Sequence, residues 1–250
     1  MAKKIDEATL AILSRVTVDG NKIFLTCGQL DRKQYQAVNE VLENMSGKWD
    51  RKTKAHVFGD DPTDRLEQVL LFGEIVPPKK YGYFPTPQPI AKQAVALACI
   101  EPGMTVLEPS AGQAAIADEA AKIVGKGNLY CYELLADNCE VLAGKGYSFG
   151  RGDFLAVSTD ANPLVDRVVM NPPFEKQADI DHVLHAWKFL KPGGRLVSIM
   201  SAGVIFRDNR KSVEFREMVT NHGAMSRLPE GSFKESGTGV NTVLVVMDKP

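Results

Sequence analysis

Four consecutive residues, Asn171-Pro172-Pro173-Phe174, are the strongest candidates for a chemical role. They directly follow the apolar run 168–170. Proline fixes the backbone φ angle and has no N–H donor, so the Asn171 amide and the Pro172 carbonyl can be held rigidly beyond a strand. Two fixed acceptors beside an aromatic ring suit a planar amino group, such as the exocyclic amine of adenine. They would favour the tetrahedral nitrogen of a methyl-transfer transition state, while Phe174 would stack on the base.

Small and acidic residues follow three other apolar runs, where ligands bind in open α/β sheets. After Glu108, small residues let a ligand approach the amides at a helix N-terminus, although a tight turn without a ligand would look the same. Glu133 follows the next run, where a carboxylate can accept hydrogen bonds from both ribose hydroxyls. Asp153 would accept a hydrogen bond from an adenine amine, and Phe154 would cover the ring. The glycine spacing matches neither the dinucleotide nor the ATP motif.

Apolar runs typical of β-strands alternate with helical patterns from residue 88 onward. Strands are expected at 105–108, 128–133, 165–170 and 195–201, and helices near 113–123, 135–145 and 178–190. This alternation predicts a doubly wound, mostly parallel sheet. The last β-rich run, 240–247, follows a glycine-rich loop rather than a crossover helix, so this strand is expected to be antiparallel.

The breaker-rich segment 76–83 predicts a linker between two units, residues 1–75 and residues 84–250. The first unit opens with a hairpin signal, because Asp19-Gly20-Asn21 lies between two β-rich runs. Further elements are expected as a helix capped by Asp31, a turn and strand over 48–58, and a helix from 61 to 71. The first unit is therefore expected to be a small α+β unit.

Taken in order, these motifs resemble those of class I S-adenosylmethionine-dependent methyltransferases of the amino-methylating group, which carry an N/D-P-P-Y/F motif. The resemblance covers residues 84–250. It implies an α/β, Rossmann-like class I methyltransferase fold, with a seven-stranded, mostly parallel sheet and an antiparallel last hairpin, plus the small N-terminal α+β unit. It also implies S-adenosyl-L-methionine as the cofactor. The segments 228–233 and 237–242 are similar to the late loop and last strands of the DNA N6-adenine enzymes.

The resemblance assigns roles to individual residues of this sequence. The catalytic motif would consist of Asn171, Pro172, Pro173 and Phe174. The segment 84–87 is similar to the one in which Phe and Thr embrace the methionine part of the cofactor. The residues implied in cofactor binding are Phe84, Thr86, Pro87, Glu108, Pro109, Ser110, Ala111, Gly112, Glu133, Leu134, Asp153, Phe154 and Asn171.

Two features depart from the pattern of this family. Glycine is usual two residues after Gly112, where this chain has Ala114. DNA enzymes with this motif order often carry a large separate recognition domain, whereas this chain ends shortly after its last expected strand. Target selectivity would then come from residues 1–75, from loops or from a partner subunit, or it would be weak.

Two basic segments are candidates for contact with nucleic acid. The segment 48–54 surrounds a tryptophan with basic residues, so it would either track phosphates and stack a base or be a solvated hairpin with the ring packed inside. It resembles a short module of nucleic-acid-processing proteins. The segment 207–211 would be either a rim of the active site or a solvated helix start. The candidate residues are Lys48, Trp49, Arg51, Lys52, Lys54, Arg207, Arg210 and Lys211.

Composition and spacing argue against several other classes of protein. Thirty Lys and Arg against 31 Asp and Glu give a net charge of −1, so a polyanion would have to be bound by a local patch. The isolated cysteines and the lack of a long apolar stretch are typical of a cytoplasmic protein with reduced thiols and no membrane contact. His182 and His185 invite a metal site, but their helix needs its apolar positions against the sheet, and methyl transfer from a sulfonium needs no metal. No metal is expected.

The favoured interpretation is methyl transfer to the N6 amine of adenine in DNA, with the base flipped into the pocket around Asn171. An RNA base or a glutamine amide in a protein would suit the same motif, because all three acceptors are planar amino groups. A cofactor-binding subunit that is inactive without a partner is the alternative from another class. DNA is the expected partner, RNA is the alternative, and a partner subunit for target recognition fits either.

Overall fold

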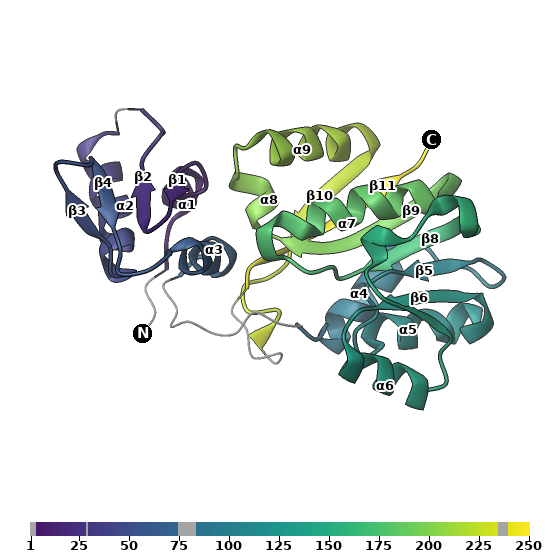
Figure 1. The fold of residues 1–250 in the computed structure, drawn as a ribbon. Helices are drawn as coiled ribbons and strands as arrows, with labels where there is room; N and C mark the ends of the chain where they lie inside the picture. The colour runs from purple at the N-terminus through teal and green to yellow at the C-terminus, as the bar shows by residue number, and fades with distance from the viewer. Residues whose placement is uncertain (1–3, 29, 75–83, 235–239) are drawn as a thin grey trace. The chain divides into compact units, whose positions relative to one another are not determined.

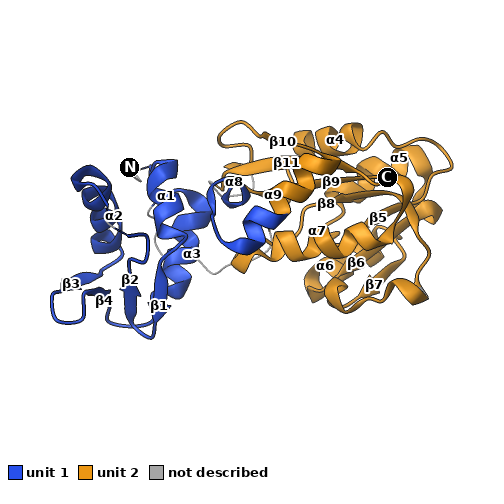
Figure 2. Cartoon of the chain, turned by 90° about the horizontal axis from the view of Figure 1, so that it is seen from above, with its two compact units in different colours: residues 1–81, 202–214 blue, residues 82–201, 215–250 orange. Residues whose placement is uncertain are grey.

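The computed structural model describes residues 4–28, 30–74, 84–234 and 240–250. The chain forms two compact units, one of Met1–Tyr81 with Ala202–Glu214, and one of Gly82–Ser201 with Phe215–Pro250 (Figure 2). The linker expected at 76–83 lies outside the described residues. The first unit therefore includes a segment, 202–214, that the sequence pattern placed in the second.

The second unit is built on a seven-stranded sheet with the order β10-β11-β9-β8-β5-β6-β7 (Figure 1). Its strands are β5 (Val106–Glu108), β6 (Leu129–Glu133), β7 (Phe149–Arg151), β8 (Val165–Met170), β9 (Leu190–Ser201), β10 (Gly223–Arg227) and β11 (Thr242–Asp248). The parallel pairs are β5 with β6, β5 with β8, β6 with β7 and β8 with β9. Strand β11 is antiparallel to both β9 and β10. The predicted sheet and its antiparallel last hairpin are confirmed.

Helices cover both faces of this sheet, with α5 and α6 on one side and α7 on the other (Figure 1). The helices are α4 (Gln88–Leu97), α5 (Ala115–Val124), α6 (Ala136–Gly144), α7 (Ala178–Ala186) and α9 (Arg210–His222), in which the division between the two units falls after Glu214. Short 3-10 turns lie at Lys126–Asn128, Phe154–Ala156, Thr159–Ala161, Glu175–Gln177 and Trp187–Phe189. Because both faces are covered, the central strands are apolar on both sides, as in β8, where Val168, Val169 and Met170 are all buried.

The first unit combines an antiparallel sheet of order β1-β2-β4-β3 with helices packed against it. Its elements are α1 (Glu7–Leu13), β1 (Thr17–Asp19), β2 (Lys22–Phe24), α2 (Arg32–Asn44), β3 (Lys48–Asp50), β4 (Ala55–Val57), α3 (Thr63–Phe72) and α8 (Gly203–Phe206). The predicted hairpin forms with Gly20 at φ 55°, and Asp31 caps α2 by accepting a hydrogen bond from the Gln34 N–H at 2.8 Å. Helix α1, capped by Asp6, was not expected from the sequence.

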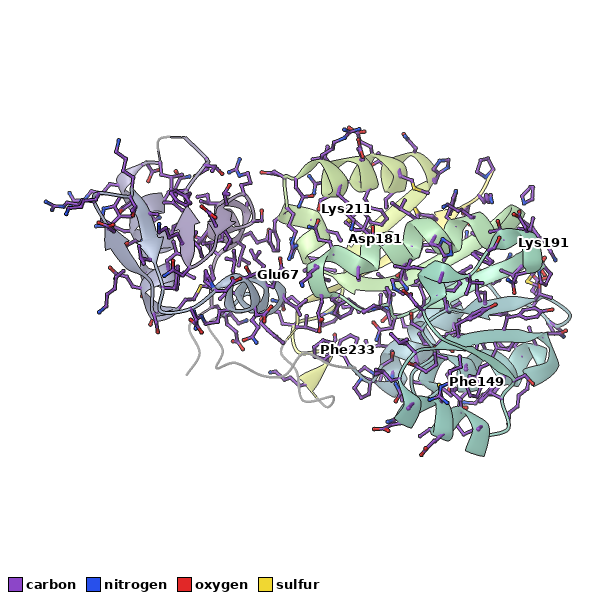
Figure 3. The ribbon with its side chains drawn as sticks, viewed as in Figure 1. Glu67, Phe149, Asp181, Lys191, Lys211 and Phe233 are labelled. Atoms are coloured by element: carbon purple, nitrogen blue, oxygen red, sulfur yellow. The ribbon has the colours of Figure 1, made fainter. Side chains whose placement is uncertain are left out.

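The segment 202–214 belongs to the first unit because its side chains are bound there. Phe206 packs against a hydrophobic core that includes Leu13, Ile23 and Leu42. Arg207 is 4% exposed, and its guanidinium lies 3.2 Å from the carboxylate of Glu67, which projects from α3 (Figure 3). This contact and the packing of Phe206 tie the segment to the first unit.

A buried histidine makes the stability of the first unit depend on pH. The Nε2 atom of His56 lies 2.8 Å from Asn39 Oδ1, and its Nδ1 is buried without a partner among the described residues. Burial lowers the pKa of His56 below its usual value of 6.5, because a charged ring would lose its hydration. The unfolded chain therefore takes up a proton first, and stability falls as the pH drops below 6.5.

We expect denaturant midpoints of the first unit to fall between about pH 7.5 and pH 5.5. The fluorescence of Trp49, which lies 5.2 Å from the His56 ring, reports on this unit in a Trp187→Phe background. His56→Gln keeps a donor for Asn39 and cannot be charged, so its midpoint should fall less over the same range. An equal fall in both proteins would contradict this account.

Candidate active site

The side chain of Asn171 joins two segments that are far apart in the sequence. It follows the last residue of β8, and its Nδ2 donates to Phe84 O at 3.2 Å and to Thr86 Oγ1 at 3.0 Å. Because a backbone carbonyl only accepts hydrogen bonds, the contact with Phe84 O fixes which end of the amide is the nitrogen. The orientation of the Asn171 oxygen is therefore determined by its neighbours.

The oxygen of this amide has no hydrogen-bond partner in the part of the chain that the structure describes. Asn171 Oδ1 is buried and accepts no hydrogen bond from any described residue. An unpaired buried acceptor costs about 1–3 kcal/mol, a cost that a ligand with a donor group can remove. The Phe174 ring is 3% exposed and stacks on Phe84 with ring centroids 6.0 Å apart and planes at 17°. The motif 171–174 and the segment 84–87 thus form one site with a fixed, unsatisfied acceptor.

Glu133, at the end of β6, holds the loop that follows β5. One oxygen of its carboxylate accepts hydrogen bonds from the N–H groups of Leu134 and Leu135, both at 2.7 Å. The other accepts from Gly112 N–H at 2.6 Å. A carboxylate has about four acceptor sites, so one site remains for a ligand hydroxyl, on the Oε2 atom that accepts only the Gly112 N–H.

The loop after β5 is mostly buried and is tied to the neighbouring strand β6. Burial raises the pKa of Glu108 well above its usual value, and the nearby carboxylates of Asp118 and Glu133 act in the same direction. Its Oε2 atom is buried without a partner among the described residues. The N–H of Ala111 donates to Tyr132 O at 2.9 Å, which ties the loop to β6. Pro109, Ala111 and Gly112 are buried, and Ser110 is partly exposed.

Ala114 stands where the related motif usually has glycine, and its backbone is in a conformation that favours glycine. Its φ is 70° and its ψ is 24°, the left-handed conformation that glycine adopts without strain. An L-residue pays roughly 1–2 kcal/mol for this conformation. The backbone at position 114 therefore has a conformation that suits glycine, and alanine at this position costs stability.

Ala114→Gly should raise the free energy of unfolding by up to about 1 kcal/mol, because relief of strain exceeds the added entropy of the unfolded chain. The matched control is Ala117→Gly in the interior of α5, which should lower it by about 1 kcal/mol. Urea titrations of the three proteins measure both effects. Destabilisation by both glycines to the same extent would show that Ala114 is not strained.

Asp153 and Phe154 lie where the sequence predicts, but the ring of Phe154 does not have the expected role. Asp153 is exposed after β7, and its Oδ1 accepts a hydrogen bond from Leu155 N–H at 2.9 Å. Phe154 is 2% exposed and packs against four rings, those of Tyr132, His182, His185 and Phe189. Its faces are occupied by the core, so it is a structural support beneath Asp153 rather than a cover for a base.

Three exposed leucines follow the ends of β6 and β7, near the buried Phe154 in the sequence. Leu134 is 62% exposed directly after Glu133, and Leu135 and Leu155 are also exposed. Since β6 and β7 are parallel neighbours, these side chains follow strand ends on the same edge of the sheet. Large apolar side chains left in solvent often mark a binding surface. Leu135 and Leu155 were missed from the sequence, where a leucine after a strand looks like any other core residue.

The remaining predicted residues are structural or belong to the first unit. Pro87 precedes α4, where its carbonyl accepts hydrogen bonds from the N–H groups of Ile90 and Ala91. Arg207 is buried against Glu67, which removes it from the candidates for nucleic-acid contact. Arg210 is ion-paired with Glu214 at 2.6 Å. Lys211 is partly buried on α9, and the basic residues of 48–54 are exposed.

The histidines of α7 are explained by packing. His182 is buried, and His185 Nε2 lies 3.0 Å from the carbonyl of Val157. Among the described residues, no three His, Cys, Asp or Glu side chains are grouped so as to hold a metal ion. The described helices also include none with the length and apolar character needed to cross a bilayer.

The late loop expected from the sequence lies between β10 and β11. Leu228 and Phe233 are both buried, and Leu228 N–H donates to Thr242 O at 3.0 Å. Phe233 is labelled in Figure 3. Residues 237–239 of the predicted loop lie outside the described part of the chain.

The strand order, the antiparallel β11 and the site at the strand ends define a class I S-adenosylmethionine-dependent methyltransferase fold. The family model described as N-6 DNA Methylase matches residues 158–250, so the resemblance to the N6-adenine enzymes is confirmed over this part of the chain. No curated protein sequence matches the chain.

Solved structures show the same fold at low sequence identity. The M protein of the type I restriction enzyme EcoKI is 18% identical with a TM-score of 0.59, and the match covers 96% of this chain and 56% of that one. The methyltransferase subunit of a type I restriction-modification system from Streptococcus thermophilus is 20% identical with a TM-score of 0.59, covering 88% and 55%. TrmN from Thermus thermophilus is 20% identical with a TM-score of 0.50, covering 89% and 69%. The chain thus spans about half the length of the two type I subunits.

Proposed function

We propose that this protein transfers a methyl group from S-adenosyl-L-methionine to the exocyclic N6 amine of adenine in DNA. The observation that carries the proposal is the buried, unpartnered Oδ1 of Asn171 in a rigid Asn-Pro-Pro-Phe motif. Such an atom is ready to accept a hydrogen bond from an amine. The match of residues 158–250 to the N-6 DNA Methylase family supports adenine in DNA as the acceptor.

The catalytic residues act by position and by electrostatics. S-adenosylmethionine supplies a methyl group whose leaving group is a neutral thioether. Asn171 Oδ1 and the Pro172 carbonyl accept the two amine hydrogens, so the nitrogen lone pair, otherwise delocalised into the ring, is directed at the methyl carbon. Phe174 stacks on the flipped base once the ring of Phe84, which is stacked on it in this structure, gives way. The surplus proton leaves the nitrogen to water after the transfer.

The residues present fit the cofactor. Glu133 presents a carboxylate held by three amides, and its Oε2 atom has a remaining acceptor site that suits a ribose hydroxyl. Leu134 offers an exposed apolar surface for the adenine of the cofactor, and Asp153 offers an acceptor for its amine. Phe84 and Thr86 hold Asn171 directly, which couples the methionine-binding segment to the catalytic motif.

Incubation with radiolabelled S-adenosylmethionine tests the proposal on four acceptors in parallel: duplex DNA free of N6-methyladenine, single-stranded DNA, total RNA and cell protein. Label in DNA is expected. Label only in RNA or in glutamine would keep the mechanism and replace the acceptor. Cofactor binding without label in any acceptor would support a subunit that depends on a partner for target recognition.

A further inference from the structure

A basic hairpin in the first unit combines exposed cations with an exposed aromatic ring. We define it as residues 48–54, which contain β3 and the turn to β4. β3 is the outer strand of its sheet and pairs only with β4 in the described structure. The exposed side chains of the hairpin are those of Lys48, Trp49, Arg51, Lys52 and Lys54.

The cationic side chains of this hairpin have no acidic partner among the described residues. Lys48, Arg51, Lys52 and Lys54 form no ion pair with any described residue. Asp50 is the one acid in the segment, and both of its oxygens are used in the turn. Oδ1 accepts from Lys52 N–H at 3.0 Å, and Oδ2 accepts from the Thr53 hydroxyl at 2.9 Å. In a chain of net charge −1, this is a local cationic surface facing solvent.

Trp49 lies among these cations, and its ring packs against that of His56. It lies opposite His56 in the β3–β4 pairing, and the two rings meet edge to face at 5.2 Å and 60°. His56 is in turn bound to Asn39 on α2. The indole is nevertheless 40% exposed, unlike the buried His56 beside it. A supported ring that remains in solvent can stack on another planar group at little entropic cost.

We propose that the basic hairpin binds a DNA strand, with its cations on the phosphates and Trp49 stacked on an unpaired base. Cations spaced along a hairpin match the repeating charge of a phosphate backbone, and an aromatic ring among them stacks on any base. The inference rests on the proposed function for its choice of DNA. It adds a binding surface outside the catalytic unit, and it favours single-stranded over duplex DNA at this surface.

The test is fluorescence anisotropy of the full chain, without cofactor, on a labelled single-stranded oligonucleotide and on its duplex. Arg51→Gln with Lys52→Gln should weaken single-strand binding about tenfold and reduce the slope of log affinity against log salt by about 1.4. Trp49→Ala should weaken it by about fivefold or more, and Trp49→Phe should restore most of that loss. The matched control is Arg32→Gln with Lys33→Gln on α2, which removes the same charge from exposed positions of the same unit and should change affinity less than about twofold.

Several outcomes would overturn the inference: no binding of DNA by the unchanged chain, equal losses in the hairpin and control variants, or no effect of either hairpin variant while circular dichroism shows all of them folded. If Trp49→Ala loses less affinity for the single strand than for the duplex, the stacking role of Trp49 is wrong. A parallel assay of methyl transfer with the same variants separates this inference from the proposed function. DNA binding that depends on the hairpin, without methyl transfer, would support the hairpin as a binding surface and reject the proposed activity. DNA methylation that the hairpin variants leave unchanged would support the activity and reject the role of the hairpin.

Discussion

Asn171→Ala should lower methyl transfer by at least about 100-fold, because it removes one of the two acceptors that align the target amine. The structure supports this expectation, since Oδ1 is buried without a partner among the described residues and is therefore available to the amine. The affinity for S-adenosylmethionine should change only a few-fold. Single-turnover rates and calorimetric titration of the cofactor measure the two quantities separately.

Two companion variants show whether the loss comes from the Oδ1 atom. Thr86→Val removes one of the two acceptors that hold the Asn171 Nδ2 and leaves Oδ1 in place, so its loss of rate should be clearly smaller. Asn128→Ala is the control. Asn128 lies directly before β6, its side-chain amide donates a hydrogen bond to Val124 O, and its loss should leave the rate unchanged. If Asn171→Ala instead weakens cofactor binding strongly, while the complex formed at saturating cofactor transfers methyl at the full rate, Asn171 is a cofactor residue and the catalytic assignment is wrong.

Glu133→Ala should weaken cofactor binding by about 1–3 kcal/mol, which corresponds to roughly 5- to 150-fold in the dissociation constant. The variant loses the acceptor proposed for a ribose hydroxyl. It also leaves the N–H groups of Gly112, Leu134 and Leu135 without their partner, so the loop after β5 should lose its fixed position. Isothermal titration with S-adenosylmethionine and with S-adenosylhomocysteine measures the change.

Glu140→Ala is the matched control for this experiment, because Glu140 lies on the neighbouring helix α6 with its side chain exposed. It should bind the cofactor as the unchanged chain does. The thermal midpoint of Glu133→Ala should also fall, and titrations are therefore made well below it. Unchanged cofactor affinity in a folded Glu133→Ala protein would remove Glu133 from the site.

The parts of the site that the sequence predicts are those encoded by local pattern. The motif 171–174 and Glu133 each follow an apolar run, and the end of a parallel strand is where such residues meet a ligand. The mostly parallel sheet follows from the alternation of strands and helices, and the antiparallel β11 follows from the glycine-rich loop that precedes it in place of a crossover helix. These features depend on a few consecutive residues and on general rules of chain topology.

The parts that the sequence could not predict depend on contacts between distant residues. The transfer of 202–214 to the first unit relies on the Arg207–Glu67 ion pair, whose members are 140 positions apart. The burial of Phe154 depends on rings from β6, α7 and the turn after α7, and local sequence gives no sign of them. The bond from Asn171 to Phe84 O likewise joins segments 87 positions apart.

The most direct test of the central claim is mass spectrometry of nucleosides from DNA incubated with the protein and S-adenosylmethionine that carries a deuterated methyl group. The account predicts deuterated N6-methyldeoxyadenosine with the unchanged chain and its loss with Asn171→Ala. A deuterated methyl group on cytosine alone, or deuterated N6-methyldeoxyadenosine formed equally well by Asn171→Ala, would contradict it.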